Sequence, residues 1–210
     1  MKPTILTLLL LACGLAFGQK FQDMSAKGSP VSLGVKQADM GPYVAVRNDS
    51  REAILAMVAI VRTTVKHGGV TPCASHMDYA FKSGVLAPQE ERFACLMGLP
   101  SKVQRVTSVV GAVLFVQFDD GTTWGDPIAG KELLAERPPK LAFLQNLVET
   151  YYESGEDAFA TLLNQAKPTS PEGTVAACLK SDAQYEKIAT IDLAKKRLAA
   201  AQGWRALGIF

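Results

Sequence analysis

The sequence predicts an α+β protein, in which an antiparallel β-sandwich comes first and helices follow. Three observations support this fold class. Val109 to Phe118 is a long run of Val, Phe and Leu without proline, and such side chains suit a pleated, buried strand. Asp120-Gly121 directly after it is a two-residue hairpin signal. Asp126-Pro127 then combines a helix N-cap with proline at the first helical position, so the chain changes from strand to helix there.

The strand over residues 109–118 is apolar on both faces. A half-exposed strand alternates polar and apolar residues, but here both alternating sets are apolar: Val110, Ala112, Leu114, Val116 and Phe118 on one face, and Val109, Gly111, Val113 and Phe115 on the other. Both faces of the sheet therefore need cover. We expect the helices that follow to provide it on the outer side.

Short strands separated by turn residues precede this run, which is typical of a sandwich. The predicted strands are residues 31–36, 43–47, 53–64, 77–82 and 92–97, with a Gly-Gly loop over 66–71 and a return strand over 122–124. Residues 53–64 mix helix-favouring Leu, Met and Ala with strand-favouring Ile, Val and Thr. Their position between turn signals, directly after a strand, favours a strand, and a helix is the alternative.

Three segments of this half resemble small immunoglobulin-like domains of exported bacterial proteins. They are YVAVRNDSREAI (residues 43–54), VLAPQEERF (85–93) and FDDGTTWGD (118–126), which are similar to a strand and Asn-x-Ser turn, an Ala-Pro connector and a terminal hairpin. Gln89 stands where the connector often has glycine. The resemblance covers roughly residues 30–126 and implies an immunoglobulin-like β-sandwich, with no assigned activity.

The second half of the chain is predicted to be helical. Apolar stripes, helix caps and breakers predict helices over residues 128–137, 140–153, 156–165 and 182–202, with a linker over 167–173, a short helical turn over 174–179 and an apolar tail over 204–210. Ser181 and Gln184 have capping-box spacing at the start of the last helix. The basic run Lys195-Lys196-Arg197 is expected to be a solvated face.

The first residues read as an export signal. Residues 1–18 carry Lys2, an apolar run and small residues near a cleavage position after Gly18. The alternative is a lipobox ending at Cys13, which would anchor the protein to lipid. The predicted organisation is a signal peptide (1–18), an immunoglobulin-like sandwich (29–126) and a helical region (127–210). The protein is thus expected to be periplasmic or secreted.

The charge balance gives little attraction for nucleic acid. Cleavage after Gly18 leaves 21 of the 22 basic residues and all 20 acidic ones. Sequence-independent nucleic-acid binding requires many clustered cations, so we expect no nucleic-acid partner. No second apolar segment is long enough to span a membrane after cleavage.

Three cysteines would remain after cleavage, and an oxidising compartment favours a disulfide between two of them. Cys73 and Cys95 both lie in the β half and are the candidate pair. A bridge between them would stabilise the fold by roughly 3 kcal/mol in the chain-entropy description. Cys178 is then expected to be a small buried apolar residue.

One cluster has residue types that bind metals. His67, Cys73 and His76 follow one another in one loop region, and Asp78 could be a fourth ligand. The spacing matches no familiar zinc motif, and exposed loop histidines are the simpler interpretation. The sequence has no Gly-rich phosphate loop and no Gly-x-Ser-x-Gly nucleophile motif.

These observations favour a non-enzymatic binding or structural module of the bacterial envelope, without a cofactor. Its partner would be another envelope protein, bound through the C-terminal helices. Two alternatives stay open: a small metal-dependent hydrolase using His67, Cys73, His76 and Asp78, and a lipid-anchored envelope protein using Cys13.

Overall fold

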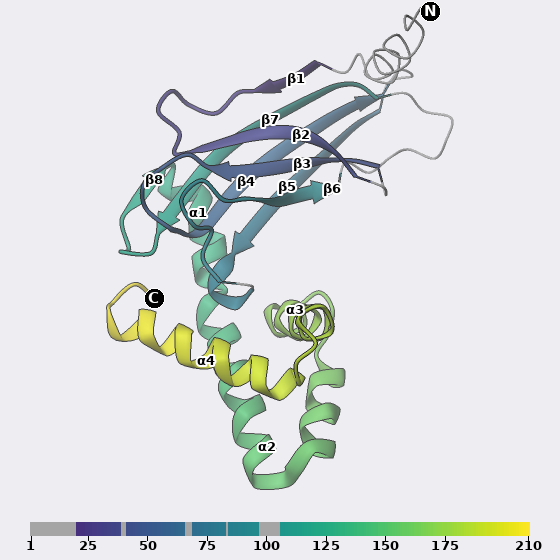
Figure 1. The fold of residues 1–210 in the computed structure, drawn as a ribbon, viewed down its shortest axis with the longest axis vertical. Helices are drawn as coiled ribbons and strands as arrows, with labels where there is room; N and C mark the ends of the chain where they lie inside the picture. Colours follow the sequence, from purple (N-terminus) through teal and green to yellow (C-terminus); the bar gives the residue numbers. More distant parts are fainter. Residues whose placement is uncertain (1–19, 39–40, 66–68, 83, 97–105) are drawn as a thin grey trace, which may run out of the picture.

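Two facing β-sheets lie above a layer of helices in the computed structural model, which describes residues 20–38, 41–65, 69–82, 84–96 and 106–210 (Figure 1). The first sheet has the order β1 (Lys20–Asp23), β7 (Val106–Phe118), β4 (Ile54–Val65) and β5 (Val70–Asp78), and β8 (Thr123–Gly125) also pairs with β7. The second sheet has the order β2 (Val31–Ala38), β3 (Gly41–Asn48) and β6 (Glu91–Leu96). Neighbouring strands are antiparallel except for the parallel pair of β1 and β7.

The two sheets share one apolar core. Leu33 and Val44 of the second sheet pack in the same buried cluster as Met57, Met77 and Val113 of the first. At Gly111 the sheets approach so closely that an added Cβ would lie 2.8 Å from Leu33 Cδ1. The predicted α+β class is therefore confirmed, with two largely antiparallel sheets preceding the helices.

Residues 53–64 form a strand, as predicted. β4 pairs with β5 on one side and with β7 on the other, so it is a central strand of its sheet. The turn before it is organised by Asn48, a fully buried side chain whose Nδ2 donates to the carbonyl oxygens of Glu52 and Leu86. Its Oδ1 accepts from the backbone and the hydroxyl of Ser50. The Asn-x-Ser turn predicted at residues 48–50 therefore joins β3 to β4. Asn48 also forms hydrogen bonds with the Ala87–Glu90 connector.

The hairpin after β7 was placed correctly, but its turn differs from the prediction. A two-residue turn with positive φ at both positions was expected, and only Gly121 has positive φ (+89°). The amide of Gly121 donates to the Phe118 carbonyl, and Phe118 donates back to Thr122. This pattern is a three-residue loop, a common alternative to the two-residue turn.

The first helix begins where the sequence predicted, but the second begins at Arg137 and not at residue 140, and it bends at Gly155, where the prediction ended a helix. α1 (Pro127–Ala135) is capped by Asp126, whose carboxylate accepts from the Ile128 amide at 2.8 Å. α2 (Arg137–Gln165) has its two prolines in the first turn, where missing N–H groups cost nothing. It bends at Gly155, where φ is +83°.

The last two helices differ from the prediction. α3 (Pro171–Glu186) begins within the expected linker, because Ser170 accepts from the Gly173 amide and Pro171 occupies the first turn. The expected cap at Ser181 is wrong, since that residue lies inside α3. Lys187 adopts the left-handed conformation that ends α3. α4 (Thr190–Ala206) then continues through Gly203, which was expected to end it.

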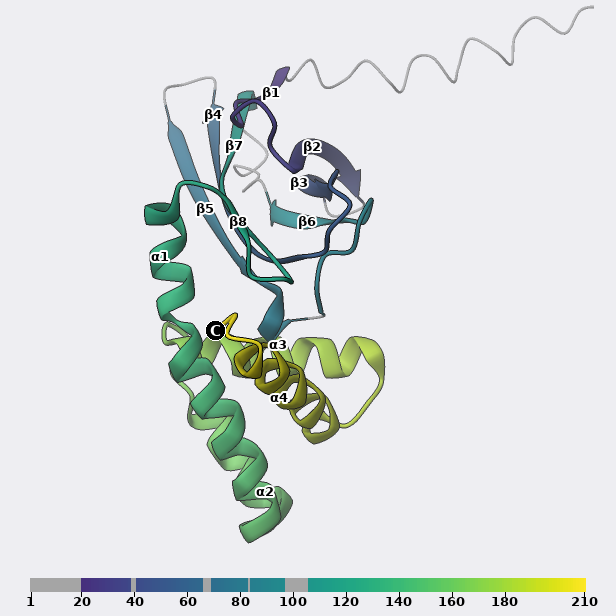
Figure 2. The ribbon, with the colours of Figure 1, turned by 90° about the vertical axis from the view of Figure 1, so that its left-hand side faces the viewer.

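The helix α1 covers the outer face of the first sheet. Leu133 of α1 packs with Ala56, Val58 and Phe115 in a separate buried cluster, which confirms that the second face of the central strand is covered by a helix. Figure 2 shows α1 beside the sheet and α2 running away from it. α2, α3 and α4 form their own core with Leu55, Ala80 and Phe81. The helical cover predicted for this sheet is therefore supplied mainly by α1, whereas α2, α3 and α4 pack mostly on one another and meet β4 at Leu55.

Among the described residues, no helix has the length and apolar character required to cross a bilayer.

Candidate functional site

The end of β5 is where the sheets meet the helical layer. The strand predicted over residues 77–82 is wrong beyond Asp78, where β5 stops and a 3₁₀ helix, η1 (Tyr79–Phe81), begins. Asp78 caps this turn, since its Oδ1 accepts from the Ala80 amide at 3.3 Å. The caps of short turns and the ends of strands have similar local sequences, so only tertiary contacts distinguish them here.

Asp78 also forms a buried ion pair with Arg137, the first residue of α2. Arg137 Nε donates to Asp78 Oδ2 at 2.9 Å and Nη2 donates to Oδ1 at 3.3 Å. Both side chains are about 3% exposed. A buried, two-pronged pair of this kind holds the two elements in a fixed orientation, because either charge left alone would be strongly unfavourable.

The C-terminal tail packs back onto this ion pair. The Arg137 guanidinium lies over the Phe210 ring, with 4.6 Å from Cζ to the ring centroid, and its Nη1 donates to the Ile209 carbonyl. Phe210 also contacts Phe81 and stacks on Trp204. The apolar tail is therefore largely an intramolecular contact, although Leu207 stays exposed. The chain end lies between the sheets and α4 (Figure 1).

Two pockets flank η1, and Lys82 lines both of them. We call the larger one, of about 180 Å³, the lysine pocket. It lies between the end of β5 and the helices α2 and α3, and it is lined by His76, Asp78, Phe81, Lys82, Glu136, Lys140, Thr174, Val175 and Cys178. Lys140 is almost fully buried, donates to Glu136 at 2.6 Å and lies over the Phe81 ring. An ammonium has three donors, so this side chain retains donors for a ligand.

The smaller pocket, of about 90 Å³, we call the arginine pocket. It lies between η1 and α4, and its lining includes Tyr79, Lys82, Glu186, Lys196, Arg197 and Trp204. Arg197 is 3% exposed and its Nη2 donates to Asp182, while Nε and Nη1 have no hydrogen-bond partner among the residues that the structure describes. Burial raises the pKa of Tyr79 above its ordinary value, and the Arg92 guanidinium over its ring opposes this.

A third hollow, of about 350 Å³, lies within the helical layer alone. Phe159, Leu163 and Ile188 are among the residues that line it.

The residues of the predicted metal cluster do not share one site. Strand alternation in β5 separates them: Cys73 packs with Met77 against the core between the sheets, whereas His76 and Asp78 line the lysine pocket on the opposite face. His67 lies outside the described residues. Within the part of the chain that the structure describes, no three His, Cys, Asp or Glu side chains are grouped so that they could hold a metal ion.

The predicted lipidation site and the predicted disulfide lie partly outside the residues that the structure describes. Cys13 lies there, as does the side chain of Cys95, so the lipid anchor and the bridge to Cys73 stay predictions. The backbone of Cys95 belongs to β6, opposite Val44, and Cys73 belongs to β5 of the other sheet. A bridge between the two would therefore join the sheets.

Arg197 and Arg137 are the functional candidates that the sequence reading did not identify. Arg197 was assigned to a solvated face, and this is wrong, although Lys196 beside it is largely exposed. The sequence spacing could have indicated that Arg197 is buried. Leu193, Arg197 and Ala201 are four residues apart, so they lie on the same side of α4, and this side is buried. No comparable signal marks Arg137, whose partner is 59 residues earlier.

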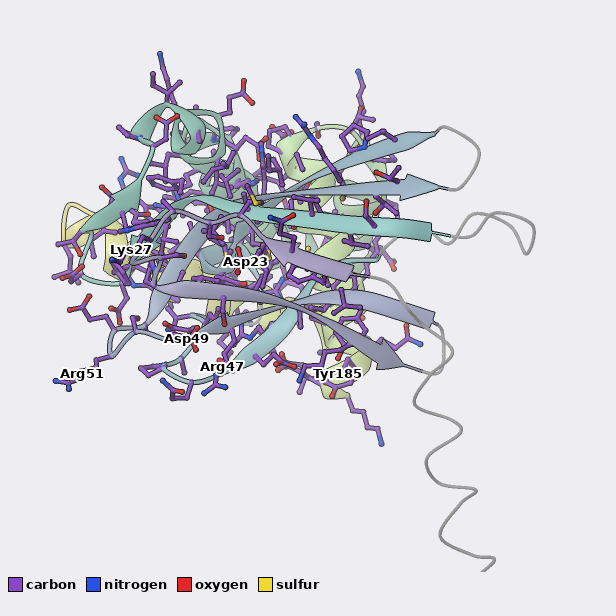
Figure 3. The ribbon with its side chains drawn as sticks, turned by 90° about the horizontal axis from the view of Figure 1, so that it is seen from above. Asp23, Lys27, Arg47, Asp49, Arg51 and Tyr185 are labelled. Atoms are coloured by element: carbon purple, nitrogen blue, oxygen red, sulfur yellow. The ribbon has the colours of Figure 1, made fainter. Side chains whose placement is uncertain are left out.

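Charges on the sandwich surface are of both signs. Figure 3 shows Arg47 near the end of β3, Asp49 and Arg51 on the turn that follows, and Lys27 on the connection between β1 and β2. Arg47 Nε and Asp49 Oδ1 are 3.2 Å apart. Asp23 is structural, because its carboxylate accepts from the amides of Ser25 and Leu33.

Comparisons with protein-family models, curated proteins and solved structures found no match to the chain.

Proposed function

We propose that this chain is an exported, non-enzymatic binding module of the bacterial envelope, and that the lysine pocket is its binding site. The observation that carries the proposal is the composition of that pocket. Both halves of the chain contribute to it, and a buried Lys140 with unused donors sits beside His76, Cys178 and the ring of Phe81. Concave sites with apolar walls and a few directed polar groups are typical of ligand-binding proteins.

We also propose that the first half of the chain has the architecture of an immunoglobulin-like sandwich. Two facing sheets with an apolar core between them support it. Counted from β2, where the likeness begins, the first two strands are neighbours in one sheet and the third, β4, lies in the other, as in the first three strands of an immunoglobulin domain. We place the binding site at the sheet–helix junction, where the lysine pocket lies, and not at the loop ends that such domains use.

The hydrolase alternative receives no support from the described residues. It required Cys73 to converge with His76 and Asp78, and the pleat of β5 directs Cys73 to the other face.

Native mass spectrometry of the protein isolated from the cell envelope tests both halves of the proposal. Export predicts a chain that begins at Gln19, an acylated Cys13 would favour the lipid-anchored alternative, and an intact Met1 would contradict export. Binding predicts an additional mass on the wild-type protein that is lost in Lys140→Met. The control Lys131→Met removes an exposed lysine of α1 and should keep the ligand. A bare wild-type chain would contradict the binding proposal.

A further inference from the structure

The arginine pocket contains a buried cation that the fold does not fully satisfy. A guanidinium carries five N–H donors in a planar fork and cannot lose its charge in a protein. Arg197 donates to Asp182 through Nη2, and its Nε and Nη1, both covered from bulk solvent, have no acceptor in the described part of the chain. Buried polar groups in folded proteins nearly always have a partner, so this position lacks an acceptor group.

The surroundings of Arg197 indicate the charge of the missing acceptor. Lys82 and Lys196 line the pocket with Arg197, against one carboxylate in the lining, that of Glu186. Lys196 Nζ lies 3.9 Å from Glu186, and Asp182 balances one further positive charge at Arg197. The set retains a net positive charge, which favours an anion over a neutral acceptor.

The size of the pocket limits the acceptor to a small group. A volume of about 90 Å³ corresponds to about three water molecules, because each occupies about 30 Å³ in the liquid. A carboxylate or a phosphate head fits this space, and an oxygen of either group accepts a strong, charge-assisted hydrogen bond from a guanidinium N–H. Tyr79 and Trp204 supply apolar walls that exclude water and strengthen the attraction.

We propose that the arginine pocket is an oxyanion-binding site, in which the unpartnered Nε or Nη1 of Arg197 donates to an oxygen of a carboxylate or phosphate group, and Lys82 and Lys196 add positive charge. The two nitrogens are covered, so the ligand enters by displacing a neighbour. Lys196 is the most mobile candidate, since 73% of its side chain is exposed. This site lies on the other side of η1 from the lysine pocket and shares Lys82 with it, and its occupation does not depend on the function proposed above.

Isothermal titration of the mature chain with sodium phosphate and, separately, sodium acetate tests the proposal at constant ionic strength held with sodium chloride. We expect saturable one-site binding with a millimolar dissociation constant, weakened at least tenfold in Arg197→Gln. Binding of phosphate alone would assign the site to phosphate groups, and binding of acetate alone would assign it to carboxylates.

Two further variants keep the test interpretable if Arg197→Gln does not fold. Lys196→Gln changes a residue that lines the arginine pocket but not the lysine pocket, and it should weaken binding several-fold. Lys195→Gln removes the same charge from α4, but its ammonium lies over Tyr151 and Tyr152 outside the pocket, so binding should be unchanged. If neither anion binds, or if Lys196→Gln and Lys195→Gln weaken binding equally, the proposal is overturned and water is the occupant.

Discussion

The ion pair between Asp78 and Arg137 is the residue-scale contact on which the junction depends. Arg137→Met leaves the Asp78 carboxylate buried without its partner, and we expect the free energy of unfolding to fall by about 3–5 kcal/mol in urea denaturation. The double variant Asp78→Asn, Arg137→Met removes the charge as well and should recover part of the loss.

Lys36→Met is the matched control for this prediction. Lys36 pairs with Glu91 at 3.2 Å, but both side chains are well exposed. Exposed pairs contribute about 0–1 kcal/mol, so this variant should unfold almost as the wild type does. A loss below about 1 kcal/mol in Arg137→Met would show that the buried pair does not hold the junction together.

The stability of the connector that contains Glu90 is expected to depend on pH. Partial burial tends to raise its pKa, but hydrogen bonds from Arg92 and from the Ala87 amide outweigh this and hold the pKa below its ordinary value of 4.5. A lowered pKa in the folded state adds stability that is present above pH 4.5 and is lost as the pH falls through the folded-state value. The pH dependence of unfolding below pH 4.5 should therefore be shallower in Glu90→Gln than in the wild type. Identical slopes would contradict this role.

At the scale of elements, the packing of α1 on β7 depends on Gly130. A Cβ at this position would lie 2.7 Å from three atoms of the buried Phe115 ring. Overpacking of this kind costs about 1–3 kcal/mol, which exceeds the gain of up to about 1 kcal/mol in helix propensity. Gly130→Ala should therefore lower the thermal unfolding midpoint.

Gly203 of α4 provides the opposite case. Its added Cβ would meet no atom within 4 Å, and its φ is not positive, so only the propensity gain remains. Gly203→Ala should stabilise the protein by about 0.5–1 kcal/mol. Equal effects of the two alanine substitutions would contradict the packing of α1 on the sheet.

The elements that the sequence predicted correctly are those whose signals are local. Asp126-Pro127 and Gly155 mark helix boundaries through side-chain capping and backbone freedom, so neighbours along the chain decide them. Ser181 and Tyr79 were misassigned because tertiary contacts decide there: α3 continues through Ser181, and η1 forms where Asp78 meets Arg137. The sequence identified only part of the lysine pocket. It singled out His76 and Asp78 on β5, but not Glu136 and Lys140, which line the same pocket from the helical half.

At the scale of the whole molecule, the two sheets are expected to be joined by a Cys73–Cys95 disulfide. Cys73 lies on β5 and Cys95 on β6, in opposite sheets, so the bridge would cross the core between them. Denatured, unreduced protein produced without residues 1–18 should show one reactive thiol, that of Cys178, and reductant should lower the free energy of unfolding by roughly 3 kcal/mol. Three reactive thiols would contradict the bridge.

The central claim is that the junction between the sheets and the helices binds a ligand in the lysine pocket. Photo-crosslinking in living cells tests it most directly, with a photoreactive residue at Thr174, an exposed position that lines this pocket. The control position is Thr161, which is exposed on α2 and bonds only within its own helix. The account predicts a discrete adduct at residue 174 and none at 161. No adduct at 174, or the same adducts at both positions, would contradict it.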